Sequence, residues 1–388
     1  MSNNIRITHI CLNAYIDGWG YQENLLPLYQ KKDGMDVSII ASFNHFPPYM
    51  KSDAIKDIQS KGRDYNENGI HSYKIKTIGG TTSFTLINKR LYRTINQSEP
   101  DIIFHHDVTI PSLFKVVLYK IFHPKVKIIV DNHADYINES QNKLWVFLYT
   151  KCFTRFFNKV LSPFIDLYYG VTPVRCDYLI KCLGAPQSKV LLLPIGCDTD
   201  MVDEITDTKE ELKIKYGFKK DSFVVVSGGK MGADKGTHDL IKAVETLDNN
   251  GACIKLLLFG KFSDEDTEKL ASQKDFVNIQ GWCDRRKTLE LLIMADVACW
   301  PIHHTTLIED AVACGTPLIV RKTGNTSHII DGNGVYIENG KQSELEDALK
   351  QVLEQTNYKD MLVASDLMRR KLSYSSLSKK ILTDLNIV

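Results

Sequence analysis

Short apolar runs of strand length alternate with helical patterns through the first half of the chain. The runs read "IRITHICLN", "DVSIIAS", "DIIFHHD", "KIIVDNH" and "LYYGVTP", and amphipathic segments such as "NLLPLYQKKDG" lie between them. Strands separated by helices in this way are typical of parallel sheets, in which each helix crosses from one strand to the next. We therefore expect a doubly wound α/β domain in this half.

The same rhythm restarts in the second half with "SFVVVSGG", "IKLLLFG", "FVNIQG", "DVACWPI" and "TPLIVRK". Between the two series, Pro194 and Gly196 interrupt regular structure before an acidic helix that ends near Gly217. This places one domain at residues 1–196 and a second at 197–372. The remaining residues, 373–388, begin with serines that suit a helix cap and continue amphipathically, so they predict one more helix.

Composition changes this picture little. The 388 residues exceed one ordinary core, 43% are hydrophobic and 24% charged, and the net charge of +1 gives no reason to expect nucleic-acid binding. Nine scattered cysteines without a zinc-like spacing favour free thiols in a reducing cytoplasm. The first residues lack the features of a signal peptide, and no apolar run approaches the ~20 residues that span a bilayer.

One glycine-rich strand end carries two cations. In "FVVVSGGKMGADKG", Gly229 lets the backbone approach a ligand closely, while Lys230 and Lys235 supply positive charge suited to a diphosphate. Ligands of open parallel sheets bind beyond the carboxyl ends of the strands. The alternative is that both lysines are ordinary solvated charges. A second strand, in "MADVACWPIHHTTLIEDAVACGTPLIV", runs into a loop and a helix bearing Glu309 and Asp310, which favours a shared site.

These motifs resemble the retaining, nucleotide-sugar-dependent glycosyltransferases of family 4. The resemblance covers nearly the whole chain and is strongest from Val224 to Val335, through "SGGKMGADKG", "IQGWCD", "MADVACWP" and "EDAVACGTPLIV". It implies a GT-B fold of two Rossmann-like domains facing a cleft. The N-terminal domain would bind the acceptor and the C-terminal domain the nucleotide sugar, and the C-terminal helix would cross back to the N-terminal domain.

In that family, the positions of Lys230 and Lys235 hold the donor diphosphate and stabilise the charge that develops as the sugar leaves. The resemblance therefore implies a UDP- or GDP-sugar as substrate, with no cofactor and no metal. The "DTD" at 198–200 resembles a metal-binding motif of other sugar transferases, but it falls in the linker and is not expected to bind metal.

The carboxylates depart from the family pattern. Family members carry two glutamates with seven residues between them; Asp310 takes the second position, and the first falls on Ile302, whose side chain cannot accept a hydrogen bond from a sugar. Glu309 is expected to serve instead, and which of Glu309 and Asp310 contacts the sugar stays open. Alternatively, Glu309 only caps its own helix through the capping box "TLIE". Thr306 and Leu307 are expected to offer backbone amides to the diphosphate.

Two further candidates lie in the N-terminal half. Gly18 and Gly20 follow the first strand, where the family places a loop against the donor phosphates, although an ordinary strand–helix turn would also use them. His133 ends another predicted strand and resembles the family histidine near the reacting sugar, so we favour it over His105 and His106. Its expected role is to contact the donor sugar and orient the reactants.

Two segments are basic and aromatic without any acid. Residues 111–130 read "PSLFKVVLYKIFHPKVKIIV", and residues 142–161 read "NKLWVFLYTKCFTRFFNKVL". Helices of this kind suit an anionic membrane surface, with aromatic residues such as Trp145, Phe156 or Phe157 inserting and cations such as Lys151 meeting headgroups. Alternatively, the aromatic residues belong to the core and the lysines to a solvated face.

Together these features predict a retaining glycosyltransferase that moves a hexose from a nucleotide sugar to a hydroxyl of a glycan or lipid-linked glycan in bacterial surface polysaccharide assembly. We expect the protein in the cytoplasm, and the basic aromatic segments favour additional peripheral contact with the inner face of the plasma membrane. Two alternatives remain: a nucleotide-sugar epimerase of the same fold, and a non-catalytic protein that binds nucleotide sugar or glycan. The sequence leaves the donor sugar, its base, the acceptor and the linkage open.

Overall fold

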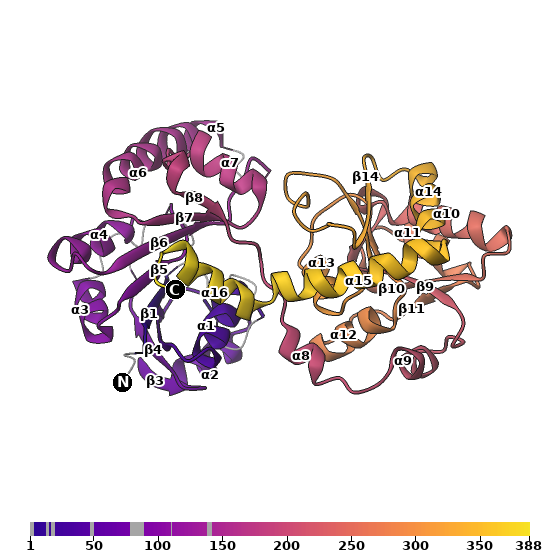
Figure 1. Cartoon of the computed structure of the whole chain (residues 1–388), viewed down its shortest axis with the longest axis horizontal. Coiled ribbons are helices and arrows are strands. Elements are labelled where there is room, and N and C mark those ends of the chain that lie inside the picture. The colour runs from indigo at the N-terminus through magenta and orange to yellow at the C-terminus, as the bar shows by residue number, and fades with distance from the viewer. Residues whose placement is uncertain are drawn as a thin grey trace. The chain divides into compact units, whose positions relative to one another are not determined.

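The structure is a computed structural model of the whole chain, and it describes residues 4–12, 15–16, 20–46, 50–77, 89–109, 111–137 and 142–388. The chain forms two compact units (Figure 1). The first unit contains residues 1–194 and 374–388, and the second contains residues 195–373. The first unit thus ends two residues before the expected boundary at 196, and the C-terminal segment from Tyr374 belongs to it.

The first unit is built on an eight-stranded sheet in the order β3-β4-β2-β1-β5-β6-β7-β8. All neighbouring strands are parallel except β3 and β4, which form an antiparallel pair at one edge. Its elements are β1 (Arg6–Cys11), α1 (Gln22–Lys32), β2 (Asp36–Ser42), α2 (Ser52–Ser60), β3 (Asp64–Glu67), β4 (Ile70–Ile75), α3 (Lys89–Ser98), β5 (Ile102–His105), α4 (Leu113–Phe122), β6 (Lys127–Asn132), α5 (Lys143–Trp145), the π-helix η1 (Val146–Thr154), α6 (Arg155–Leu161), η2 (Ser162–Phe164), β7 (Leu167–Gly170), α7 (Pro173–Lys181), η3 (Gln187–Lys189), β8 (Val190–Leu192) and α16 (Tyr374–Asp384).

Alternate residues of the central strands build a separate core on each face of this sheet. Ile103 and Ile128 pack with helices α3, α4 and α7, whereas Phe104 and Ile129 pack on the other face with α1 and α16. Figure 1 shows α16 beside α1. A hydrogen bond of 2.7 Å from the Tyr169 hydroxyl to Asp384 Oδ2 also holds α16 on this face. The C-terminal helix is therefore an integral layer of the first unit.

The second unit contains a fully parallel six-stranded sheet in the order β11-β10-β9-β12-β13-β14. This is the 3-2-1-4-5-6 order of a doubly wound dinucleotide-binding fold. Its elements are α8 (Thr199–Asp203), α9 (Lys209–Lys215), β9 (Phe223–Met231), η4 (Ala233–Lys235), α10 (Thr237–Asn249), β10 (Ile254–Phe262), α11 (Glu265–Ser272), β11 (Val277–Ile279), α12 (Arg285–Met294), β12 (Val297–Trp300), α13 (Leu307–Ala313), β13 (Leu318–Arg321), β14 (Gly334–Ile337), α14 (Gln342–Leu353) and α15 (Gln355–Leu372). Both units are therefore α/β layers of the predicted class.

A buried carboxylate ties four elements of the second unit together. Asp296, just before β12, accepts hydrogen bonds from Lys213 Nζ at 2.8 Å, from the Val224 amide at 2.7 Å and from the Tyr358 hydroxyl at 3.2 Å. Lys209 Nζ lies 2.7 Å from Oδ1, the oxygen that also accepts from Tyr358, whereas Lys213 and the Val224 amide bond Oδ2. Burial alone would raise the pKa of Asp296, but the two lysines and the amide hold it below its usual value. This carboxylate therefore joins α9, β9, β12 and α15.

Replacing Asp296 by alanine should lower the free energy of unfolding of the second unit by about 3–5 kcal/mol, because it leaves two largely buried ammonium groups unpaired. The lowered pKa adds a pH dependence: the stabilisation by Asp296 is present above the unfolded value near 3.9 and is lost as the pH falls through the folded value. Urea titration followed by tryptophan fluorescence measures both effects.

The matched control is Asp360→Ala on the exposed face of α15, which should change the urea midpoint little. Equal midpoints for the two variants would contradict this account of the second unit.

Candidate functional site

In the second unit, the carboxyl end of β9 lies where the strand order of the sheet reverses. β9 pairs with β10 on one side and with β12 on the other, so the connections from these two central strands leave in opposite directions. Gly229 takes a φ of +99° there, and an added Cβ would lie 3.3 Å from Leu307 Cδ1. The predicted glycine and the start of α13 are therefore neighbours at the position where open α/β sheets bind ligands.

The two predicted lysines follow this glycine on separate elements. Lys230 lies in β9 and is exposed, without an ion pair to any residue that the structure describes. Lys235 ends η4, with its Nζ 3.3 Å from Asp234 Oδ2. Burial and the nearby Lys235 charge lower the pKa of His303, in the loop after β12. The Lys235 charge therefore reaches the loop that follows β12.

Glu309 lies in the first turn of α13 and is almost fully buried. Its Oε1 is 2.7 Å from His304 Nε2, while Oε2 has no hydrogen-bond partner among the described residues. Thr306, the N-cap residue, makes no side-chain capping bond. The capping-box alternative is therefore wrong, because the Glu309 carboxylate turns to His304 instead of its own helix. A buried carboxylate oxygen without a protein donor can accept a hydrogen bond from water or from a ligand hydroxyl.

Asp310 is held differently from its neighbour. Its Oδ2 accepts a hydrogen bond from Arg285 Nη1 at the start of α12. Burial raises the pKa of Asp310, and the Arg285 charge opposes that rise. Because adjacent residues of a helix point in different directions, the two carboxylates meet different surroundings. Asp310 has a strong protein partner, whereas Glu309 keeps one oxygen open.

Ile302, at the position of the missing family glutamate, is a packing residue. Gly236 at the start of α10 has a φ of +76°, and an added Cβ there would lie 2.8 Å from Pro301 Cβ and 3.0 Å from Ile302 Cγ1. The loop after β12 therefore rests directly on the backbone of Gly236. Thr306, the exposed N-cap residue, ends this loop, and the half-buried Leu307 begins α13.

In the first unit, Gly18 lies outside the described residues, and Gly20 is exposed just before α1. His133 follows β6 directly, as the apolar run predicted. It is one of several polar side chains gathered at the carboxyl ends of β1, β5 and β6, the three neighbouring strands at the centre of the sheet. These side chains are His9, Glu23, His106, Asp131 and His133.

Asp131 is the fully buried centre of this cluster. Its Oδ1 accepts from the Asp107 amide at 2.7 Å, and its Oδ2 is 2.6 Å from His106 Nδ1 and 3.4 Å from His133 Nε2. Burial opposes its ionisation, yet the histidine charges hold the pKa of Asp131 far below its usual value. Asp131 is thus a buried anion shared by two histidines.

The proton positions in the cluster follow from these partners. Burial would lower the pKa of His106, but Cys11 and Asp131 raise it well above its usual value. Burial and the His106 charge lower the pKa of His9 to about 3. His106 therefore donates from Nδ1 to Asp131 and from Nε2 to His9 Nδ1 at 2.9 Å, and neutral His9 donates from Nε2 to Gln30 Oε1 at 2.6 Å.

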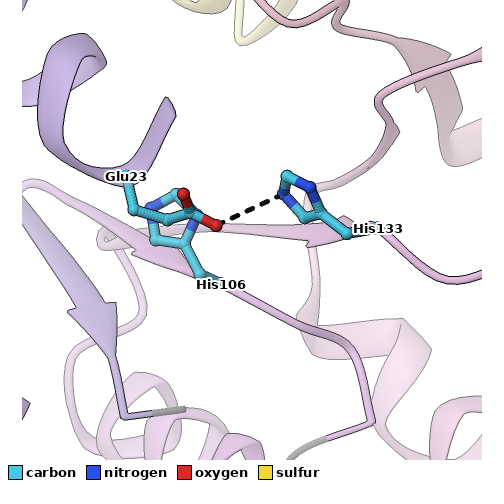
Figure 2. Close-up of side chains that lie close together, drawn as sticks. All are labelled: Glu23, His106 and His133. Carbon is cyan, nitrogen blue, oxygen red and sulfur yellow. Dashed lines mark ion pairs between the residues drawn. The ribbon is translucent and has the colours of Figure 1, made fainter. Parts of the chain in front are cut away.

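Figure 2 shows Glu23 and His133 facing each other, with His106 beside them. His133 Nε2 is 3.7 Å from Glu23 Oε1, and burial, which lowers the pKa of His133, is outweighed by Asp131 and Glu23. One ligand atom from each of these three residues lies within 4.8 Å of the others, close enough to hold a metal ion. However, both ring nitrogens of His106 already have partners, Asp131 and His9. The bonds favour a charged hydrogen-bond network over a metal centre.

Sequence reasoning found His133 and missed Glu23 and Asp131. Asp131 stands two residues before His133 in "VDNH", so two polar residues on the same side of a strand end were a usable signal. Glu23 comes from α1, over a hundred positions earlier in the chain, and no local pattern connects it with His133. His106, ranked below His133, turns out to share its carboxylate.

The Asp131 charge predicts the titration of His133. The imidazole of His133 should titrate above the ordinary value of 6.5 and fall toward or below it in Asp131→Asn, because the buried anion is lost. Since the folded pKa is raised, the stabilisation by this group is complete below 6.5 and is lost as the pH rises through the folded value. Histidine-selective NMR follows the ring signals.

Glu23→Gln is the matched control, because it removes a half-exposed charge farther from the ring and should shift His133 less. A His133 titration that is identical in all three proteins would refute the network.

Comparisons with known proteins agree with this architecture. Residues 208–365 match the model of the family described as "Glycosyl transferases group 1". A processive diacylglycerol alpha-glucosyltransferase from Acholeplasma laidlawii is 22% identical over 183 residues, which are 42% of this chain and 54% of that protein. The chain spans between a third and about half of the length of the curated relatives it matches.

Two solved structures match nearly the whole chain. A glycosyltransferase from Rickettsia africae aligns with a TM-score of 0.71 at 16% identity, covering 99% of this chain and 98% of that one. The Anabaena protein HepE in complex with UDP and glucose aligns with a TM-score of 0.64 at 15% identity, covering 99% and 100%. These likenesses concern the fold. The chain is therefore a protein of the GT-B glycosyltransferase fold whose residues 208–365 match the group 1 glycosyl transferases.

Proposed function

We propose that this protein is a glycosyltransferase that moves a sugar from a nucleotide sugar to a hydroxyl acceptor. One observation carries the proposal: Lys230, Lys235 and the open oxygen of Glu309 come from the ends of the central strands β9 and β12. This part of the chain lies inside the region that matches group 1 glycosyl transferases. A site for a nucleotide sugar requires cations for the diphosphate and a hydrogen-bond acceptor for a hydroxyl of the donor sugar.

The two lysines would carry the electrostatics of the reaction. When the bond between sugar and phosphate breaks, the leaving nucleoside diphosphate gains negative charge, and fixed cations lower the barrier because they stabilise that charge. Lys230 is exposed and has no ion pair to any residue that the structure describes, so it can turn to a ligand. Within the same described residues, Lys235 pairs with the surface residue Asp234. Gly229 lets the phosphates approach the backbone, and the amides of Thr306 and Leu307 are further donors.

Of the two acidic residues, we propose that Glu309 contacts the donor sugar. Its unpartnered Oε2 can accept from a hydroxyl, whereas Asp310 is engaged by Arg285. His304 would orient the Glu309 carboxylate through the bond to Oε1. Glu309 thereby compensates for Ile302, which packs on Gly236 and has no polar atom to offer.

In the first unit, we propose that His133 acts as a cationic hydrogen-bond donor to the substrate. Asp131 and Glu23 raise the pKa of its imidazole and so favour the charged form, and a third of its side chain is exposed. Such a donor suits a sugar hydroxyl or a phosphate oxygen. We further propose a UDP- or GDP-hexose donor without a metal, retention of configuration, and a glycan or lipid-linked glycan acceptor of bacterial surface polysaccharides.

Lys230→Ala and Lys235→Ala should each lower kcat/KM for donor turnover by roughly 30- to 1,000-fold, equivalent to about 2–4 kcal/mol of transition-state stabilisation, and should leave the fold intact. Release of nucleoside diphosphate from UDP-glucose and GDP-mannose, with and without a lipid-linked glycan fraction, measures this. UDP-glucose comes first because HepE was solved with UDP and glucose.

Lys242→Ala is the matched control, since Lys242 is an exposed lysine farther along α10. Wild-type turnover in both site variants would overturn the role of the lysines. Nucleotide binding without any turnover would favour the non-catalytic alternative, and isomerised donor would favour the epimerase.

We also propose that the protein contacts an anionic membrane through a basic aromatic surface, defined as the exposed residues of α4, α5, η1 and α6. Its apolar members include Phe114, Phe122, Leu144, Phe147 and Phe156, each more than half exposed. Trp145 is 36% exposed, whereas Phe157 packs against the core and is not part of the surface. No helix in the described part of the chain is long and apolar enough to cross a membrane.

Vesicles of phosphatidylglycerol should sediment the protein at low salt, and the triple substitution of Lys151, Arg155 and Lys159 by glutamate should abolish this. Each cation near an anionic surface contributes about 1 kcal/mol, which salt screens. A matched triple substitution of the exposed Lys219, Lys220 and Lys242 by glutamate in the second unit tests for a general charge effect. Unchanged sedimentation of the first variant would contradict the proposal.

A further inference from the structure

An apolar pocket opens between α4 and the helical segment formed by η1 and α6. Its volume of about 420 Å³ falls in the range of small-molecule sites, about 300–1,000 Å³. Its walls are mainly hydrocarbon and aromatic, contributed by Val108, Leu113, Phe114, Phe153, Phe157 and Leu161. The residues that line the pocket all belong to the first unit, and none of them is a side chain of the polar cluster around Asp131.

The unusual helix beside the pocket gives one wall its shape. η1 is a π-helix of nine residues, far longer than the single-turn π-bulges that proteins ordinarily contain. Aromatic rings four positions apart follow one another from α5 through η1 into α6, in the order Trp145, Tyr149, Phe153 and Phe157, with centroids 4.9, 5.6 and 4.4 Å apart. The first two pairs are stacked and the third is tilted. The Tyr149 hydroxyl donates to the Thr109 carbonyl at 2.9 Å and fixes this aromatic row to the loop before α4.

One polar atom in the pocket lacks a partner. Thr154 lines the pocket and is 4% exposed, and its hydroxyl makes no hydrogen bond to any residue that the structure describes. A buried hydroxyl without a partner costs free energy that a ligand oxygen can recover. The pocket therefore offers a long apolar wall and a single polar contact.

The surroundings of the pocket specify the ligand further. Residues 111–130 and 142–161 contain four lysines in the first segment, three lysines and one arginine in the second, and no acid. Phe114 and Phe153 line the pocket and are 55% and 39% exposed, so the apolar wall continues onto the basic aromatic surface. An apolar pocket inside a basic, apolar rim matches a hydrocarbon chain that carries an anionic headgroup.

We propose that this pocket binds one hydrocarbon chain of an anionic membrane lipid, drawn out of the bilayer when the basic aromatic surface lies on it. The inference deepens the proposed function and rests on it in one respect, namely that the lipid is the anchor of the glycan acceptor. The hydrocarbon chain lies along Phe153 and Phe157, and the Thr154 hydroxyl forms a hydrogen bond with a lipid oxygen near the headgroup. The headgroup meets Lys115 at the rim.

Titration with cis-parinaric acid, a fatty acid that fluoresces when its chain is held in an apolar site, tests the pocket without vesicles. The wild-type protein should bind it saturably with about one site. Thr154→Phe fills the pocket and should weaken binding about tenfold or more. Phe156 lies on the exposed face of the same helical segment, outside the pocket lining. The variant Phe156→Ser should therefore leave the titration unchanged while weakening vesicle binding.

Absence of saturable binding by the wild-type protein, or equal binding by a folded Thr154→Phe, would overturn the proposal. Should Thr154→Phe fail to fold, a photoreactive fatty acid on the wild-type protein decides: adducts within residues 108–115 or 153–161 support the pocket, and adducts elsewhere refute it. Displacement of parinaric acid by an acidic peptide that binds the same site saturably would also count against a lipid.

The test also separates this inference from the proposed function. Donor turnover in aqueous solution does not depend on the pocket. A protein that consumes the donor but does not bind parinaric acid would therefore refute only the lipid site. Conversely, if the protein binds the fatty acid but never consumes a nucleotide sugar, the lipid site stands and the glycosyltransferase assignment is refuted.

Discussion

The reversal of strand order at the centre of each sheet is the constraint on which the rest of the structure depends. In the first unit it falls between β1 and β5, and in the second between β9 and β12. Connections leaving the two strands diverge to opposite faces there, so their carboxyl ends stay uncovered by a crossover helix. Backbone amides and polar side chains gather at these ends because the apolar interior of each sheet cannot accommodate them.

The two units use this geometry with opposite electrostatics. The second unit presents cations on short elements, with Lys230 unpaired and exposed among the described residues and Lys235 held only by a surface neighbour. The first unit buries an anion, Asp131, beside His106 and His133, and its charge raises the pKa of both imidazoles. The exposed cations remain available to a mobile anionic ligand. The buried carboxylate instead fixes the orientation and charge of His133.

The fold followed from the sequence because the strands are buried on both faces and therefore read as apolar runs, such as "FVVVSGG" for β9. The lysine pair was visible because glycines mark the same strand end. Other parts lacked a local signal. The Glu23 and His133 pair joins α1 to the end of β6, and the bond from His304 to Glu309 replaces a capping box that local spacing alone favours. The π-helix η1 was expected as an ordinary amphipathic helix, because its composition does not distinguish the two hydrogen-bond patterns.

The central claim is that the β9 and β12 strand ends bind a nucleoside diphosphate. The most direct measurement is the thermal stability of the purified protein in the presence of UDP, GDP, ADP and CDP, with inorganic pyrophosphate as the probe of charge alone. The account predicts that one nucleotide raises Tm well above the effect of pyrophosphate, and that the rise disappears when Lys230 and Lys235 are both replaced by alanine. A rise that survives the double substitution, or no response to any nucleotide, would contradict it.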